Sequence, residues 1–328
     1  MANLKEIKNS LIKFDGRLWS ILKSIRPRQW LKNFALFAPA LFSGQLFEPK
    51  ILNRLLLGFV LYSLASSGAY LFNDVIDAKK DRSHPFKKLR PIAAGKISAK
   101  LALTLSFTLS SSALYLAYLT SNRFFFLSLV FFILLQFAYS LFFRNQIIID
   151  ALLVALTFLT RVFAGSFVIG ASISSWLILS TVGVSLLLAF GKRRSERTLL
   201  ASGDARFQST PHPTRTTLLH YPDTLLDSMI SVSASFTIIS YSLFSFQISP
   251  RNPNSFLTFL LPPTLSAPKW MMLTIPFVIY GVARYLYVIY EKKEGESPER
   301  VLISDLPLLF TIISWTVVTV MIIYFLGS

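Results

Sequence analysis

The sequence of 328 residues has no cysteine and only three histidines. Without cysteine, disulfides and thiolate-bound zinc or haem are excluded. The histidines, His84, His212 and His220, have neither the spacing of metal ligands nor that of a catalytic triad. Carboxylates are also scarce, because 16 Asp and Glu stand against 33 Lys and Arg. The chemistry is therefore expected from a few acidic side chains and the many basic ones.

Charged residues of both signs make up only 15% of the chain, whereas 53% is hydrophobic and the mean hydropathy is +0.55. This balance is typical of membrane proteins. A spanning helix needs roughly 20 apolar residues, and several segments approach this length. They are residues 33–48, 52–72, 101–121, 124–143, 147–170, 175–191, 228–248, 270–290 and 306–326. We therefore predict an all-α integral membrane protein with nine transmembrane helices, of which the first is short and contains Pro39.

Lys and Arg concentrate in alternate connections: eight in the first 32 residues, eight after the second predicted helix and six after the sixth. By the positive-inside rule, the N-terminus and these connections face the cytoplasm, and nine crossings of the cell inner (plasma) membrane leave the C-terminus outside. Much of the positive charge then serves topology and attraction to anionic lipid, and nucleic acid is a poor partner because no recognition module is present. Residues 1–32 are predicted to form an amphipathic cytoplasmic arm before a single transmembrane domain, 33–328.

The segment "NDVIDAKKD" lies where the second predicted helix leaves the membrane on the cytoplasmic side. Asn73, Asp77 and Asp81 are four residues apart and share one face if the helix continues, while Asp74 reaches that face only from its flank. Carboxylates stacked at a membrane surface repel one another unless a cation is present. Mg²⁺ typically takes one or two carboxylates and completes its shell with water and substrate phosphates. The spacing therefore predicts a Mg²⁺ site held by Asn73, Asp77 and Asp81, and a phosphorylated substrate.

The following segment, "HPFKKLRPIAAGK", supplies fixed cations that could hold the rest of a diphosphate: Lys87, Lys88, Arg90 and Lys96. The alternative is a solvated loop with internal ion pairs, as most charge runs are. That alternative is less favourable here, because acidic residues at helical spacing against an apolar helix are costly without a ligand.

Arg161 lies deep within the fifth predicted helix, where a charge costs roughly 2.5 to 3.5 kcal/mol on an insertion scale. It must therefore face the interior of the bundle. Asp150 is a conceivable partner, but it is eleven residues away, about 16 Å along the same helix. A phosphate reaching into a cavity is the more favourable partner.

The segment "NDVIDAKKD", together with the basic segment that follows it, resembles the first aspartate-rich motif, NDxxDxxxD, of the UbiA superfamily of intramembrane prenyltransferases. Further segments resemble one branch, the polyprenyl-phosphate phosphoribosyltransferases, from about residue 24 to the C-terminus. They are "IRPRQWLKN", "AYLFND", "YSLFFRNQIIIDALLVALTFLTRVFAG", "GKRRSE" and "LLDSMISVSASFTIISYSLF". The resemblance implies two similar four-helix halves plus a ninth helix, with cytoplasmic loops 73–100 and 192–227 facing each other across a cavity.

Many superfamily members carry a second aspartate motif, DxxxD, in the second loop, where it binds a second Mg²⁺. Here its place is taken by Lys192, Arg193, Arg194 and Glu196, with Asp204 further on. This departure puts two-metal binding in doubt, and one or two ions remain open. Extra cations suit a donor with more phosphate, such as phosphoribosyl diphosphate (PRPP), although the basic run could also serve topology alone.

The resemblance implies Mg²⁺-dependent transfer of a 5-phosphoribosyl group from PRPP to a polyprenyl phosphate, for cell-envelope glycan precursors. Asp77, with Asp74 and Asp81, would be catalytic. Arg26 and Lys32 would hold the acceptor phosphate beside a groove between helices 1 and 9, with 193–223 as a lid. The other expected contacts to the phosphates are Arg28, where the branch usually has Lys, Tyr70, which could equally belong to an aromatic belt, Lys87, Arg90, Lys96, Arg144, Arg161, Lys192, Arg193 and Glu196.

Two alternatives remain at this stage. The first is the main chemistry of the superfamily, in which a polyprenyl group moves from its diphosphate to an aromatic or lipid alcohol. The second is a transporter without covalent turnover, which the position of the acidic cluster at one membrane surface disfavours. The length of the acceptor and the formation of a homo-oligomer are left open.

Overall fold

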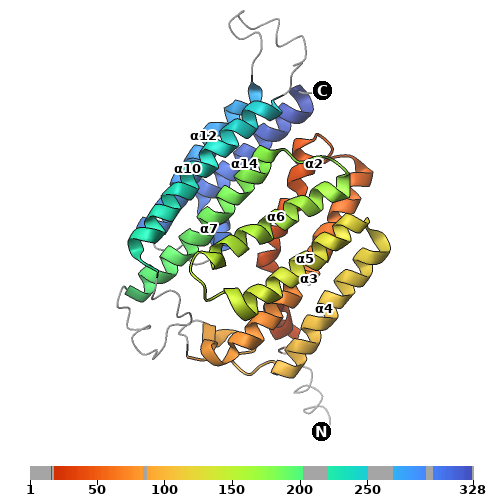
Figure 1. Cartoon of the computed structure of the whole chain (residues 1–328), viewed down its shortest axis with the longest axis vertical. Helices are drawn as coiled ribbons and strands as arrows, with labels where there is room; N and C mark the ends of the chain where they lie inside the picture. Colours follow the sequence, from red (N-terminus) through yellow and green to blue (C-terminus); the bar gives the residue numbers. More distant parts are fainter. Residues whose placement is uncertain are drawn as a thin grey trace, which may run out of the picture.

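The computed structural model describes Gly16 and residues 18–83, 87–201, 221–249, 269–292 and 298–326. Within these residues every regular element is a helix (Figure 1). Eight helices are long and apolar enough to cross a membrane. They are Pro49–Asp81, Ala99–Thr120, Arg123–Phe143, Ile149–Ile169, Ser175–Thr198, Asp223–Ile248, Trp270–Lys292 and Leu306–Phe325. The all-α prediction is thereby confirmed, and the chain is a multi-pass membrane protein.

The first predicted helix, residues 33–48, is not among them. The chain there forms a 3₁₀-helix, η1 (Pro27–Phe37), followed by a short α-helix, α2 (Ala38–Phe42). Proline lies in the first turn of each, and Pro39 cannot donate the backbone hydrogen bond that would carry one helix through both segments. Because a 3₁₀-helix rises about 2 Å per residue, the two segments still reach roughly 30 Å. The described residues therefore contain eight regular spanning helices preceded by this irregular segment, and the predicted count of nine is not confirmed.

Two helices are the longest of the bundle and exceed what a bilayer core requires. Helix α3 (Pro49–Asp81) has 33 residues and α7 (Ser175–Ala201) has 27, whereas about 20 suffice to cross. Helix α3 continues through the whole acidic motif to Asp81, as predicted. Each of the two packs along the helix that follows it, α3 along α4 (Ala99–Thr120) and α7 along α10 (Asp223–Ile248).

The remaining elements complete the bundle. They are η2 (Lys87–Leu89), α5 (Arg123–Ala138), η3 (Tyr139–Phe143), α6 (Ile149–Ile169), η5 (Trp270–Thr274), α12 (Ile275–Tyr287), η6 (Val288–Lys292), α13 (Pro298–Ser304), α14 (Leu306–Met321) and η7 (Ile322–Leu326). Figure 1 shows α3, α4 and α5 on one side and α10, α12 and α14 on the other, with α6 and α7 between them. Helix α6 contacts both α5 and α7, and so joins the two groups.

Close approach of helices depends on small residues, as is common in membrane bundles. A Cβ added at Gly68 of α3 would lie 2.8 Å from the carbonyl oxygen of Ser106 in α4. A Cβ at Gly165 of α6 would overlap the backbone carbonyl of Leu36 in η1. Gly165 therefore lets the irregular first segment lie directly against α6, and this contact places one face of η1 beside the end of α3.

The predicted amphipathic arm, 1–32, is described only in its second part. Residues 18–25 are helical, and this turn exposes Leu18, Trp19 and Leu22. Exposed apolar side chains beside lysines are typical of a helix that lies on a membrane surface, so the arm remains a prediction. Asp204, the three histidines and most of the predicted lid lie outside the described residues.

Candidate active site

A cavity of about 230 Å³ lies where α3, η1, η3, α6, α7 and α13 meet. Seven lysines and arginines and four carboxylates line it. The cations are Arg26, Lys32, Lys87, Arg90, Arg144, Arg161 and Lys192, and the acids are Asp77, Asp81, Glu196 and Glu299. The surplus of positive charge suits a ligand with several phosphate groups.

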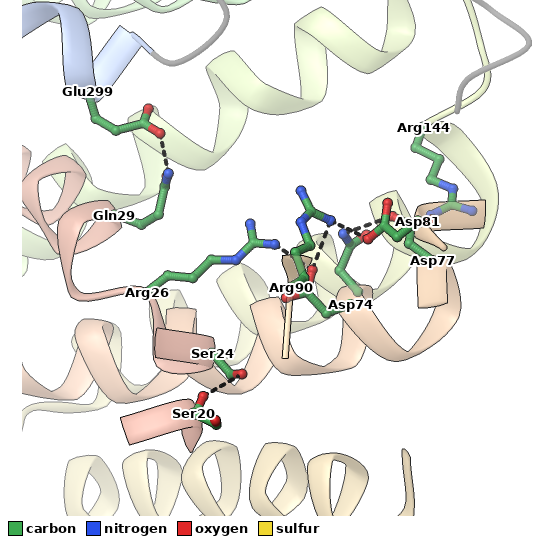
Figure 2. Close-up of polar contacts among 11 residues, drawn as sticks. Ser20, Ser24, Arg26, Gln29, Asp74, Asp77, Asp81, Arg90, Arg144 and Glu299 are labelled. Atoms are coloured by element: carbon green, nitrogen blue, oxygen red, sulfur yellow. Dashed lines mark hydrogen bonds and ion pairs between the residues drawn. The ribbon is translucent and has the colours of Figure 1, made fainter. Parts of the chain in front are cut away.

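The acidic motif presents one face of α3 to this cavity. Asn73, Asp77 and Asp81 all line it, as their spacing predicts. The amide of Asn73 donates to Asp77 over 3.1 Å, and Arg144 binds the other oxygen of Asp77. Arg90 Nη1 lies 2.6 Å from Asp81 Oδ2 (Figure 2). Each carboxylate therefore lines the cavity and is paired with an arginine that lines it as well.

Asp74 lies beneath this face and does not line the cavity. It is only 2% exposed, and both Arg26 and Arg90 bind its Oδ1 (Figure 2). The rotation of about 100° between successive helical residues explains its separation from Asn73. Asp74 therefore positions the two arginines, and the structure gives it no direct access to a ligand in the cavity.

The 3₁₀ geometry of η1 decides which of its side chains face the cavity. Arg26, Gln29 and Lys32 line it, at the spacing of three that places residues on one face of a 3₁₀-helix. Arg28 is exposed and points away, so its predicted phosphate contact lacks a place in this cavity. Gln29 was not predicted, because the sequence alone does not distinguish a 3₁₀ from an α-helical period here. Tyr70 also lines the cavity, with the Arg26 guanidinium carbon 5.5 Å from its ring centre.

In the basic segment after α3, too, only some of the predicted cations line the cavity. Lys87 and Arg90 line the cavity, whereas Lys96 is exposed and lies outside the lining. Gly95, at φ +73°, turns the chain just before Lys96. Because that turn leads into α4 at the surface, the predicted donor contact of Lys96 is not supported by its position.

Arg161 forms the deepest charged part of the cavity wall. It is 1% exposed, its Nε donates to Asn33 Oδ1 over 2.7 Å, and another nitrogen donates to the carbonyl of Thr157. Its guanidinium carbon lies 4.6 Å from the ring centre of Phe132. Among the described residues it has no carboxylate partner. The predicted interior position is confirmed, and its charge is available to an anion.

Asp150 does not pair with Arg161. Its partner is Arg193, whose Nε donates to Asp150 over 2.6 Å and whose other nitrogens contact Glu196 and Tyr139. The hydroxyl of Tyr221 donates to the second oxygen of Asp150 over 2.7 Å, and burial raises the pKa of this hydroxyl above its ordinary value. The buried network fixes α6 against α7. Arg193, predicted to bind substrate, is 3% exposed and does not line the cavity.

Lys192 and Glu196, four residues apart on α7, do line the cavity. Arg194 points to the other side, where its Nε lies 2.8 Å from Asp227. The segment "GKRRSE" therefore contributes one cation and one carboxylate to the site, and its other two arginines hold neighbouring elements.

Glu299 of α13 is a cavity residue that sequence reasoning missed. It is 9% exposed, accepts a hydrogen bond from Gln29, and lies 3.8 Å from Lys32 Nζ. Burial opposes its ionisation, but Lys32 and Lys192 outweigh burial and hold the pKa of Glu299 below its ordinary value. Its only signal in the sequence was an acidic residue in the connection between the last two predicted helices, and such residues are usually solvated.

The oxygen ligands fit Mg²⁺ rather than a metal held by protein alone. In the described part of the chain, no group of three or more His, Cys, Asp or Glu side chains is placed to hold a metal ion. Asn73, Asp77 and Asp81 nevertheless direct one amide and two carboxylates into the same cavity. That is the small protein share of a shell that Mg²⁺ completes with water and phosphate oxygens.

Comparison with solved structures identifies the fold. A UbiA homolog from Archaeoglobus fulgidus bound to DMAPP and Mg²⁺ matches 93% of this chain and 99% of its own, with a TM-score of 0.64 and 17% sequence identity. The same homolog bound to GPP and Mg²⁺ gives a TM-score of 0.63 at equal identity and coverage. The fold and the polar cavity thus define a membrane-embedded bundle of the UbiA type.

Sequence comparison identifies the family. The model of the UbiA prenyltransferase family matches residues 33–192. Decaprenyl-phosphate phosphoribosyltransferase of Mycobacterium tuberculosis is 32% identical over 76% of this chain and 82% of its own. That of Mycolicibacterium smegmatis is 30% identical over 90% and 89%, and that of Corynebacterium glutamicum 28% over 93% and 86%. The chain belongs to the UbiA prenyltransferase family and is a transferase, which confirms the predicted resemblance.

Proposed function

We propose that this protein transfers the 5-phosphoribosyl group of PRPP to the phosphate of a polyprenyl monophosphate of the decaprenyl type. The observation that carries the proposal is the cavity itself. It combines one oxygen-rich face, Asn73, Asp77 and Asp81, with seven cations, and α7 contributes Lys192 where a second carboxylate pair would bind another metal. The phosphates at both ends of the donor's ribose, together with the phosphate of the acceptor, match this spread of positive charge. The names of the relatives support the same reaction.

Asn73, Asp77 and Asp81 would hold Mg²⁺, which neutralises charge on the departing diphosphate when bound. Arg90 and Arg144 bring further positive charge to the same place. Arg161, which has no carboxylate partner among the described residues, would bind a phosphate at the deep end of the cavity. These charges are fixed before the reaction, so little reorganisation is needed as charge develops.

The bond between ribose C1 and the diphosphate oxygen breaks, and a bond from C1 to an acceptor phosphate oxygen forms. C1 develops oxocarbenium character on the way, and diphosphate leaves with the bonding electron pair. The acceptor phosphate is already ionised at neutral pH. No general base is therefore required, which agrees with a cavity lined by neither histidine nor cysteine within the described residues.

The acceptor would bind from the lipid side, with Arg26 and Lys32 at its phosphate and its tail between the first segment and α14. We assign the cavity and the N-terminus to the cytoplasm and the C-terminus to the outside of the plasma membrane, because water-soluble PRPP must reach the cavity from the cytosol. The product, a polyprenylphosphoryl-5-phosphoribose, would serve the synthesis of cell-envelope arabinan or related glycans.

Prenyl transfer is the second candidate, because Tyr70, Tyr139 and Phe158 also line the cavity and aromatic rings stabilise allylic cations. Arg161 disfavours it, since a buried cation beside Phe158 opposes a second cation there. Purified protein is given radiolabelled PRPP with polyprenyl phosphate, or polyprenyl diphosphate with 4-hydroxybenzoate. We expect labelled lipid and released diphosphate from the first pair only. Product from the second pair alone would replace our proposal with prenyl transfer.

A further inference from the structure

Helix α13 (Pro298–Ser304) brings a late segment of the chain to the cavity, in addition to the two motif-bearing helices. It packs against η1 and α14. Its residue Glu299 lies on the far side of Arg26 from the aspartates, together with Gln29 (Figure 2). Besides Glu196 of α7, the cavity therefore has two acidic places, one on α3 and one where α13 meets η1.

The second acidic place gathers cations from opposite ends of the sequence. Glu299 lies 3.8 Å from Lys32 Nζ of η1, and Lys192 of α7 interacts electrostatically with Glu299, Glu196 and Lys32. Two ammonium groups that line one small cavity repel each other unless a counter-charge lies beside them. Glu196 supplies such a charge to Lys192, and Glu299 supplies it to both Lys32 and Lys192, with Gln29 holding the Glu299 carboxylate in place through a hydrogen bond.

We propose that Glu299 is a positioning residue that holds Lys32 and Lys192 together as a two-ammonium subsite for the phosphate monoester of the lipid acceptor. This inference rests on the proposed function and deepens it. A phosphate monoester carries about two negative charges near neutral pH, which two ammonium groups balance once a carboxylate has set their positions.

The surroundings favour a lipid phosphate at this subsite over the donor. Lys32 lies on η1, and the adjacent face of η1 carries Leu31 and Phe34, which are 37% and 56% exposed and so available to acyl or isoprenoid chains. The oxygen-rich face of α3 lies on the other side of Arg26, where a Mg²⁺-bound diphosphate would be held (Figure 2). The two substrates would therefore approach from different sides of one cavity, each with its own counter-charges.

The test measures Michaelis constants for the two substrates separately, with farnesyl phosphate and PRPP as the probes. We expect Glu299→Gln to raise the KM for farnesyl phosphate about tenfold, because the paired ammonium groups separate, and to change the KM for PRPP less than about twofold. Glu299→Asp should recover part of the loss, since it keeps the charge. Glu291→Gln, which removes an exposed carboxylate of η6, is the matched control and should leave both constants unchanged.

If Glu299→Gln folds poorly, a second variant still tests the inference. Lys32→Gln changes a partly exposed side chain and should by itself raise the KM for farnesyl phosphate. When Glu299→Gln is added to Lys32→Gln, the further increase in this KM should be smaller than the increase that Glu299→Gln causes in the wild type. An unchanged KM for farnesyl phosphate in Glu299→Gln or in Lys32→Gln, or equal increases for both substrates, would overturn the inference. Wild-type protein that transfers nothing from PRPP would instead overturn the proposed function, before any variant is measured.

Discussion

Helices α3 and α7 present side chains to the cavity with the same spacing but with opposite charges. Each extends past the apolar part of the bundle and presents residues four apart to one cavity: Asn73, Asp77 and Asp81 on α3, Lys192 and Glu196 on α7. Each also carries a charge one position further along that is buried beside the cavity rather than in it. Asp74 and Arg193 hold these places.

The difference between the two helices shows that helical spacing predicts which residues share a face but not what that face binds. The same spacing offers ligands for a cation on one helix and a fixed cation on the other. A lysine cannot bind the metal ion that a carboxylate pair would bind, but it can neutralise a phosphate without a metal ion. We infer that α3 presents a metal-binding face and that α7 presents a lysine where a second metal ligand would stand, and four experiments test this difference.

Asp77→Asn should have the largest effect. It removes a charged ligand from α3 and frees Arg144, so we expect diphosphate release to fall about 10⁴-fold, as for a group central to charge stabilisation. Glu196→Gln, the matched change on α7, should cost no more than about tenfold. Release is measured on both variants at saturating PRPP and Mg²⁺. Equal losses would mean that the two helices bind metal alike.

Arg193→Met should come next and act on stability rather than on chemistry. It leaves Asp150 buried with only the Tyr221 hydroxyl, and breaking a buried pair typically costs about 3 to 5 kcal/mol. Thermal unfolding in detergent measures the loss, and activity per folded molecule should fall less than tenfold. A stable variant with abolished activity would show that Arg193 contacts substrate after all.

Lys192→Met should lower kcat/KM for farnesyl phosphate by about 10²-fold, because it removes one of the two ammonium groups proposed to hold the acceptor phosphate. Its neighbour Arg194, which is paired with Asp227 away from the cavity, provides the control. Arg194→Ala should change kcat/KM less than about threefold, since partly exposed ion pairs contribute little. Steady-state kinetics on both variants decide the matter, and similar losses in the two would argue against a specific role for Lys192.

The smallest effect concerns Asp305, which joins the last helices outside the cavity. Arg284 donates to both of its oxygens over 3.0 Å and holds the pKa of Asp305 well below its ordinary value. A depressed pKa means that the unfolded chain binds the proton first as pH falls. The stabilisation is therefore complete above about pH 4 and declines below it.

The unfolding temperature of the wild type and of Asp305→Asn, measured from pH 7 to pH 3, checks this behaviour. We expect a constant small difference down to about pH 5 and a shrinking one below about pH 4. A difference that grows on acidification would contradict the assignment. Because this group lies away from the cavity, KM for either substrate should stay unchanged.

The class of fold, the family and the acidic face could be predicted from the sequence. Long apolar runs require helices in a bilayer, because only helices and closed barrels satisfy every backbone polar group there. The spacing of Asn73, Asp77 and Asp81 placed them on one side of a helix, and the depth of Arg161 required an interior position. All of these follow from local periodicity or from the cost of an exposed polar group in lipid.

The tertiary structure alone decided which basic residues belong to the site. Arg28 and Arg193 have the same character in the sequence as Lys32 and Lys192, yet a 3₁₀ turn and a buried carboxylate direct them elsewhere. Glu299 joins the cavity only because α13 packs against η1, more than 260 residues away along the chain. Periodicity determines which residues share a face. The direction in which that face turns, and the partners it finds there, depend on packing between segments that are distant in sequence.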